Sequence, residues 1–164
     1  MKISVFAVGR MKAGPEKELA DRYFERFSKS GPAIGLEFSG LSEIPESRGL
    51  GAAERKREEA DRLKQHMVAG QAPNAALILL DERGASVSSE DFAGRLAVLR
   101  DGGRRSTVIA IGGPDGHDPS LRDAAELVLS FGAQTWPHQL VRIMLGEQLY
   151  RAVTILSGHP YHRA

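Results

Sequence analysis

Three polar segments of the chain carry residue types that could bind a ligand or transfer a proton. The C-terminal tip, 159–163, reads His-Pro-Tyr-His-Arg and follows a long apolar helix pattern without a linker. The run 112–116 is rich in glycine, and the run 132–138 holds the chain's one tryptophan. Rings and side-chain donors are unusual at the end of a chain, so the tip is predicted to belong to a site.

The residue types favour ligand binding and proton transfer over nucleophilic or metal chemistry. The sequence has no cysteine, which excludes thiolate nucleophiles and disulfides. Its histidines lack the spacing of a metal site, and no serine lies in a G-x-S-x-G turn. The run 112–116 has neither P-loop nor dinucleotide-binding spacing, and Asp115 places a negative charge where a phosphate would lie. These features predict a neutral or cationic ligand and no metal.

Length and composition describe an ordinary globular protein. The 164 residues, 41% hydrophobic and 26% charged, predict a single domain over 1–164. The net charge of +1 means that any nucleic acid would have to be held by a local basic patch. The apolar run at the N-terminus is too short for a signal peptide, and no apolar run approaches membrane-spanning length. Together with the absent cysteines, this predicts a cytoplasmic protein with no membrane partner.

Strand patterns alternate with helix patterns along the chain. This order predicts an α/β fold with a mainly parallel sheet and helices on both faces. A mobile loop is expected at 39–51 and an irregular stretch at 130–137. The expected strands are 3–8, 34–38, 75–80 and 107–111, and the expected helices are 15–30, 52–69, 88–100, 119–129 and 138–156.

The loops that follow the strands are the places where a ligand would bind. Ligands of open α/β sheets bind beyond the carboxyl ends of the strands. The segments 80–84, 112–116 and 132–138 are therefore expected to share one pocket. The last helix adds a second expectation, because it is apolar on two faces. Either a homodimer interface or complete burial inside the protein would cover the second face.

Several short motifs, in a fixed order and spacing, make the C-terminal half of the chain resemble a known family. They span about half the chain, and together they resemble the RlmH-type methyltransferases of the SPOUT superfamily. The motifs are Leu80-Asp81-x-Arg83-Gly84, Ile111-Gly112-Gly113-Pro114-Asp115-Gly116, Thr135-x-Pro137-His138, Leu140-Val141-Arg142, Glu147-Gln148-Leu149-Tyr150-Arg151-Ala152 and His159-Pro160-Tyr161-His162-Arg163.

The resemblance implies a fold, an activity and a cofactor. The fold is an α/β domain with a C-terminal trefoil knot, assembled as a homodimer. The activity is methylation of N3 of a pseudouridine in large-subunit ribosomal RNA, on assembled ribosomes, with S-adenosylmethionine as cofactor. Carried over by motif, the cofactor contacts fall on Leu80, Gly113, Gly132, Ala133, Gln134, Thr135, Trp136 and Pro137. The chain departs from the family at 131–134 and at Trp136, where the family has a Ser/Leu-rich stretch and a common leucine.

The chemistry implied by the resemblance requires that the imide N3 of the base lose its proton. Our hypothesis is that Arg142 stabilises the developing anion and that His138 or His162 takes the proton. The alternative for Arg142 is an ion pair on the helix surface with Glu147 or Asp81. The resemblance further suggests that Tyr161, His162 and Arg163 contact the RNA substrate, reaching a pocket across the dimer.

Two other functions remain open at this point. One is a SPOUT methyltransferase that acts on another RNA, such as transfer RNA. The other is a nucleotide-binding α/β module without chemistry. The near-neutral charge argues mildly against independent capture of a free RNA and favours a structured target.

Overall fold

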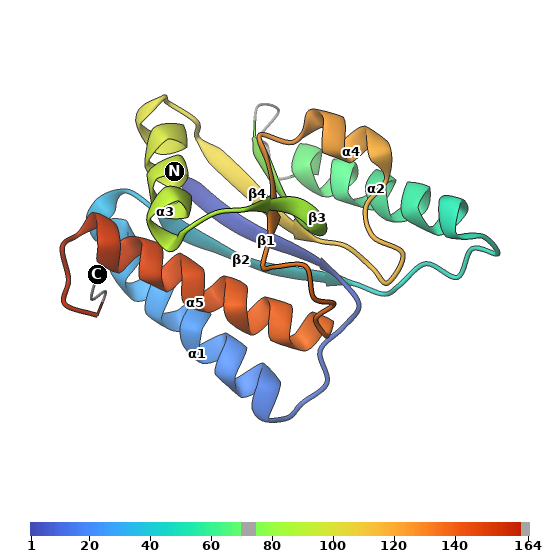
Figure 1. The fold of residues 1–164 in the computed structure, drawn as a ribbon, viewed down its shortest axis with the longest axis horizontal. Coiled ribbons are helices and arrows are strands. Elements are labelled where there is room, and N and C mark those ends of the chain that lie inside the picture. Colours follow the sequence, from blue (N-terminus) through green and yellow to red (C-terminus); the bar gives the residue numbers. More distant parts are fainter. Residues whose placement is uncertain (70–74, 162–164) are drawn as a thin grey trace.

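A five-stranded sheet forms the centre of the protein, and helices cover both of its faces (Figure 1). The computed structural model describes residues 1–69 and 75–161. Every pairing is parallel, and the strand order is β2-β1-β4-β3-β5, which confirms the predicted α/β class. The strands are β1 (Lys2–Val8), β2 (Glu37–Ile44), β3 (Ala76–Ser86), β4 (Ser106–Ile111) and β5 (Leu127–Ser130).

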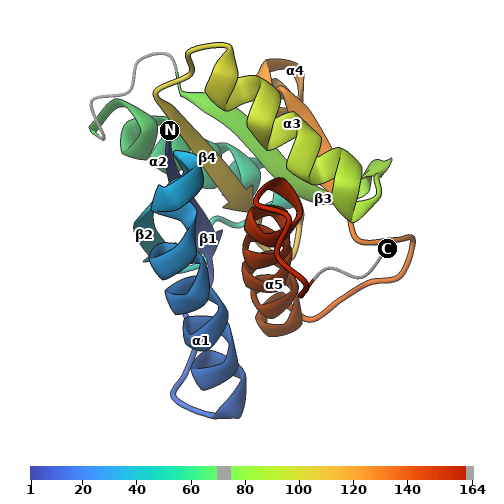
Figure 2. The ribbon, with the colours of Figure 1, turned by 90° about the vertical axis from the view of Figure 1, so that its left-hand side faces the viewer.

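The helices divide into two groups, one on each face of the sheet (Figure 2). One face carries α1 (Pro15–Ser30), α3 (Ser89–Asp101) and α5 (His138–Leu156), and the other carries α2 (Ala52–Ala69) and α4 (Pro119–Ala124). Successive side chains of a strand point to opposite faces. In β1, Ile3, Val5 and Ala7 accordingly join the first core, while Phe6 and Val8 join the second.

Local signals in the sequence place several helix ends correctly. Pro15 occupies the first turn of α1, where its missing N–H costs nothing. The Ser88 side chain caps α3 by accepting a hydrogen bond from the Asp91 amide at 3.0 Å. Asp118 caps α4 in the same way, through the Ser120 amide at 2.9 Å. Each signal lies within a few residues of the end that it defines.

The prediction for the second strand was wrong. Residues Gly31–Ile34 form a single 3-10 turn, which ends at Gly35 with a left-handed φ of 75°. The strand begins at Glu37 and continues to Ile44, through residues that we expected to belong to a mobile loop. It forms because its backbone pairs with β1, from Lys2–Glu37 to Val8–Ile44. That pairing is a tertiary interaction and leaves no local pattern.

The predicted helix over 119–129 was also wrong in its second half. α4 ends at Ala124, and Leu127–Ser130 instead form β5, the edge strand beside β3. β3 in turn runs past Leu80 to Ser86, so segment 80–84 is strand rather than loop. Its pairing with β5 is interrupted between Leu80 and Ala85. This interruption frees the side chains of 81–83 to face the carboxyl edge of the sheet.

α5 lies between α1 and α3, which cover two of its sides. Leu145, Leu149, Ala152 and Val153 are buried in the first core, and Tyr150 is partly buried against it. Ile143 and Ile155 are also only partly buried, and Leu140 is exposed, so packing within one chain covers part of the second apolar face and does not bury the helix completely. In the described part of the chain, no helix is both long and apolar enough to cross a membrane.

Candidate active site

A pocket of about 190 Å³ opens at the carboxyl ends of β4 and β5, beside residues Leu80–Arg83 in the middle of β3. The three segments expected to share a pocket all contribute to its wall. Of the residues predicted to contact a cofactor, Ala133 and Pro137 do not line the pocket, whereas the others do: Leu80, Gly113, Gly132, Gln134, Thr135 and Trp136.

The glycine loop after β4 approaches its surroundings too closely for larger residues. A Cβ atom on Gly113 would lie 2.8 Å from Oε2 of the buried Glu59. The Gly116 amide closes the turn on the Gly113 carbonyl at 2.9 Å. Asp115 forms an ion pair with Arg55 of α2, with its two oxygens 2.7 and 3.0 Å from the guanidinium. This guanidinium holds the pKa of Asp115 below its usual range. The charge of Asp115 is thus already paired.

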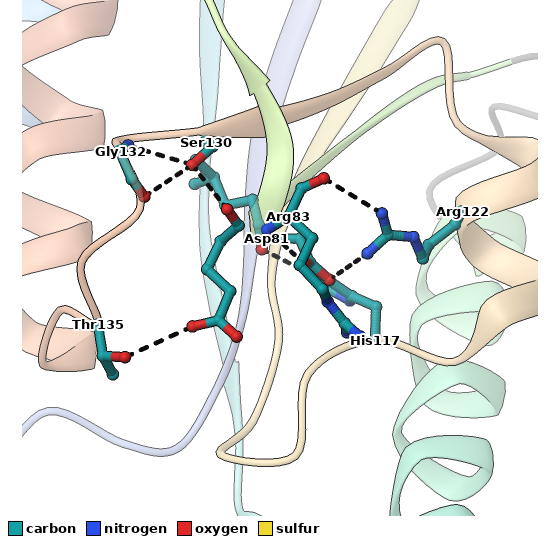
Figure 3. A network of polar contacts seen from close by, with 9 residues as sticks. Asp81, Arg83, His117, Arg122, Ser130, Gly132 and Thr135 are labelled. Carbon is teal, nitrogen blue, oxygen red and sulfur yellow. Dashed lines mark hydrogen bonds and ion pairs between the residues drawn. The ribbon is translucent and has the colours of Figure 1, made fainter.

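Asp81 anchors the pocket wall on the β3 side (Figure 3). Its side chain is 3% exposed; one oxygen accepts the Arg83 amide at 2.9 Å, and the other lies 2.8 Å from Nη1 of Arg122. Burial alone would raise the pKa of Asp81. The Arg83 amide and the Arg122 guanidinium outweigh burial, so the pKa is lowered and the carboxylate stays charged.

His117 supports the same wall from behind. Its Nε2 lies 3.1 Å from the Leu80 carbonyl, and its ring fills the space beside Gly112. Burial is the main cause that lowers the pKa of His117, so the ring is neutral near pH 7. The tautomer with its proton on Nε2 donates to the Leu80 carbonyl, which can only accept. His117 thereby fixes the backbone of a predicted cofactor contact.

Arg142 is buried beside the pocket and does not line it. The residue is 1% exposed. Nη1 donates to Oε1 of Glu43 at 2.7 Å, and Nη2 donates to the carbonyls of Val8 and Gly9 at 3.1 and 2.5 Å. Its ion-pair partner is thus Glu43, not either of the two predicted candidates, Glu147 and Asp81. Arg142 ties the start of α5 to the ends of β1 and β2.

His138 is the predicted catalytic residue that does reach the pocket. It begins α5, one turn before Arg142, and lines the pocket wall. Its Nδ1 is buried and has no hydrogen-bond partner among the described residues. Burial, and then the neighbouring Arg142 guanidinium, lower the pKa of His138. The ring is therefore neutral near pH 7 and able to accept a proton.

The chain turns after the last residue of α5, and Tyr161 folds back along the helix (Figure 1). The Tyr161 hydroxyl donates to Oε1 of Glu147 at 3.3 Å, and its ring packs edge-on against Tyr150 at 4.9 Å. Arg151 lies over the same ring at 5.2 Å. His162 and Arg163, predicted to take part in catalysis and substrate binding, lie outside the described residues.

Two acidic residues of this region escaped the sequence analysis. Glu43 fell in the segment expected to be a loop, and nothing local marks it as the partner of Arg142. Glu82 lies between Asp81 and Arg83 of a family motif and lines the pocket. Its place in the motif was a signal in the sequence that we did not use. In the described part of the chain, no group of three or more His, Asp or Glu residues is placed to hold a metal ion.

Comparison with known proteins decides the family. A family model described as "Predicted SPOUT methyltransferase" matches residues 1–162. The chain belongs to the SPOUT methyltransferase family. Curated SPOUT relatives include the "Ribosomal RNA large subunit methyltransferase H" of Mesorhizobium japonicum, 71% identical over the whole of both chains, and that of Brucella anthropi, 63% identical over the whole of both chains.

A solved structure agrees on the fold of this SPOUT chain. It is a probable methylase family protein from Haemophilus influenzae, with a TM-score of 0.53 and 11% sequence identity. The match covers 95% of this chain and 66% of the solved one. At this identity the likeness shows the fold alone.

Proposed function

We propose that this protein is an S-adenosylmethionine-dependent methyltransferase that modifies N3 of a pseudouridine in large-subunit ribosomal RNA. The full-length similarity to curated relatives with that class of substrate in their names supports the proposal. The pocket is the structural observation that carries it. It lies at the carboxyl ends of the parallel strands β4 and β5, where α/β proteins bind ligands, and its wall includes the neutral ring of His138.

The pocket fits the proposed cofactor. Its described wall combines glycine backbone and apolar side chains with three carboxylates and the neutral polar side chains of Gln134, Thr135 and His138. Its one lysine or arginine, Arg83, already lies against Asp81. Such a wall suits a positively charged sulfonium better than a polyphosphate. Leu80, Gly113 and the segment 132–136 would hold the cofactor. When bound, S-adenosylmethionine supplies a methyl group that the sulfonium has already activated.

His138 and Arg142 have different tasks in the reaction. The neutral His138 ring accepts the N3 proton of the base, and the electron pair left on nitrogen then forms the new N–CH₃ bond. Arg142 is enclosed by Glu43 and two carbonyls and cannot reach a substrate in this arrangement. It acts as a positioning residue that sets where His138 lies. His162 is the other candidate for the proton acceptor.

The tip enters the site from a second copy of the chain. Tyr161 folds back along α5 to contact Glu147 and Tyr150, about 13 Å along the axis from His138 at roughly 1.5 Å per residue. It does not line the pocket of its own chain. We therefore propose a homodimer in which Tyr161, His162 and Arg163 of one protomer contact RNA at its partner's pocket. The trefoil knot and the cytoplasmic location remain predictions of the same proposal.

Methyl transfer to defined RNAs tests this function. Labelled S-adenosylmethionine is offered with assembled ribosomes, isolated large subunits, naked ribosomal RNA and transfer RNA, and the modified nucleoside is identified. The expected product is N3-methylpseudouridine, formed on ribosomes. A product on transfer RNA would instead support a different RNA substrate. Absence of cofactor binding at millimolar concentration would support a module without chemistry.

A further inference from the structure

One carboxylate of the pocket has no cation beside it. Three acidic residues line the wall: Asp81, Glu82 and Asp115. Asp81 lies against Arg122, and Asp115 against Arg55. Within the described residues, Glu82 has no ion-pair partner. Its charge is therefore available to a ligand.

The Glu82 backbone is fixed, whereas its carboxylate is only lightly held. The Ser130 hydroxyl lies 3.1 Å from the Glu82 carbonyl and 2.9 Å from the Gly132 carbonyl, joining β3 to the loop after β5 (Figure 3). Among the described residues, the carboxylate has one hydrogen-bond contact, from the Thr135 hydroxyl at 3.5 Å, which is the outer limit of a hydrogen bond. Because its backbone is fixed and its carboxylate is weakly bonded, Glu82 is suited to form an ion pair with a cationic group of a ligand.

The neighbouring Arg83 does not neutralise Glu82. Its Nε lies 3.4 Å from Asp81, and its Nη2 lies 3.7 Å from the position of a Cβ on Gly116. Arg83 thus lies toward the glycine loop, whereas Glu82 contacts Thr135 of the 132–138 segment. The two charges belong to different sides of the pocket wall.

We propose that Glu82 is the counter-charge for the sulfonium of the bound cofactor and that it makes the pocket prefer the cofactor over its demethylated product. This inference rests on the proposed function. Transfer of the methyl group turns a positively charged sulfonium into a neutral thioether in S-adenosylhomocysteine. The attraction to Glu82 therefore exists before the transfer and is lost after it. Product release is favoured by the same step that consumes the methyl group.

Binding of both forms of the cofactor to a Glu82→Gln variant tests this role. Calorimetry gives the two dissociation constants, and fluorescence of Trp136, the chain's one tryptophan and part of the same wall, gives a second readout. We expect the Kd for S-adenosylmethionine to rise by about three- to tenfold, because the pair is partly exposed, and the Kd for S-adenosylhomocysteine to stay within about twofold. The preference of the wild-type protein should also shrink as salt increases.

Two control variants separate charge from structure. Glu37→Gln makes the same change at the start of β2, at the opposite edge of the sheet, and should leave both affinities unaltered. Thr135→Val removes the one side-chain contact of Glu82 but keeps its charge, so the preference for the sulfonium should persist. Thermal unfolding of each variant confirms that the fold is retained.

The remaining outcomes would overturn the inference. An equal rise in the Kd of both ligands would mean that Glu82 contacts a group that they share, such as the ribose or the amino group. Unchanged affinities would make Glu82 a solvated surface residue. Either result, in a protein that binds S-adenosylmethionine and methylates RNA, leaves the proposed function standing. Failure of the wild-type protein to bind the cofactor at millimolar concentration would remove both.

Discussion

Buried polar side chains hold the strand ends in place around the pocket. Arg142 binds the carbonyls that end β1, His117 contacts the carbonyl that ends the buried part of β3, and Glu59 lies under the glycine loop after β4. Each of them is enclosed by protein and none is free to contact a ligand directly. At the scale of single residues, precise placement of the pocket depends on groups behind its wall.

Removing the Arg142 side chain should destabilise the protein strongly. An Arg142→Met variant removes the cation paired with Glu43 and the donor of two carbonyls, and breaking a buried pair in this way costs about 3 kcal/mol. Urea unfolding measures the free energy of unfolding. As a control, Lys17→Met breaks an exposed i, i+4 pair with Asp21 and should leave the midpoint nearly unchanged. Equal midpoints for wild-type and Arg142→Met proteins would contradict this role.

Stability should decline as the pH falls below about 6.5. Burial lowers the pKa of His117 from its ordinary value of 6.5, so below that pH the unfolded chain takes up a proton that the folded protein resists. The stabilising contribution is complete above pH 6.5 and is lost as the pH falls toward the folded pKa. His138 contributes in the same direction.

The His117→Gln variant isolates this contribution to the pH dependence. The amide keeps a donor for the Leu80 carbonyl but has no proton to gain in this range. Unfolding free energies between pH 7 and pH 5 should therefore fall less steeply than in the wild-type protein. The same slope in both proteins would show that His117 does not titrate as its burial implies.

At the scale of elements, the sequence reveals what is local and misses what depends on pairing. α1 and the start of α3 follow from a proline in the first turn and a serine cap, which act within a few residues. β2 and β5 form on sheet edges that β1 and β3 provide, and their short runs of side chains also suit a loop or a helix. Helix patterns and family motifs thus located the pocket segments, but not the extension of β3 that shapes one wall.

A glycine in that extension should be irreplaceable. A Cβ on Gly84 would lie 2.6 Å from the Val128 carbonyl oxygen and 2.7 Å from the Leu129 carbonyl carbon, both part of β5 backbone. Gly84→Ala must push the two strands apart, at a cost of about 1–3 kcal/mol in unfolding free energy, and should weaken cofactor binding. Chemical unfolding and calorimetry measure the two effects.

Gly94 provides the matched control. It lies inside α3, and a Cβ there would meet nothing within 4 Å. Gly94→Ala should therefore stabilise the protein by about 0.5–1 kcal/mol, because alanine loses less backbone entropy on folding than glycine. If both variants changed the free energy of unfolding by the same amount, the close approach of β3 to β5 would not explain why position 84 requires glycine.

At the scale of the whole molecule, α5 sets the geometry of the proposed site. Its first residue, His138, lines the pocket, and the chain after its last turn folds back so that Tyr161 contacts Glu147. The arrangement was only partly visible in the sequence. The tip's composition marked it as functional, and the family resemblance predicted that it reaches a pocket across the dimer. The contact of Tyr161 with Glu147, away from the pocket of its own chain, depends on how the chain turns after α5 and could not be read from the sequence.

Mixed dimers test whether the tip acts on the partner's pocket. A chain lacking residues 161–164 should bind S-adenosylmethionine nearly as well as the wild type and have no methyltransferase activity. A His138→Ala chain should also be inactive. Unfolded and refolded together in equal amounts, the two should regain activity in about a quarter of all sites, because half the dimers then contain one complete site. No recovery in verified mixed dimers would contradict a shared site.

The position of α5 also governs how the chain folds as it is synthesised. Ala20, Phe24 and Phe27 of α1 are buried in the core that α5 completes, and Gly146 lets the two helices approach so closely that a Cβ would lie 3.1 Å from Tyr23. The residues of α1 near position 20 are thus buried by residues of α5 near position 146. A chain emerging N-terminus first carries this apolar face uncovered until α5 has been synthesised. We therefore expect α1 to reach its final packing only after more than 100 further residues have emerged.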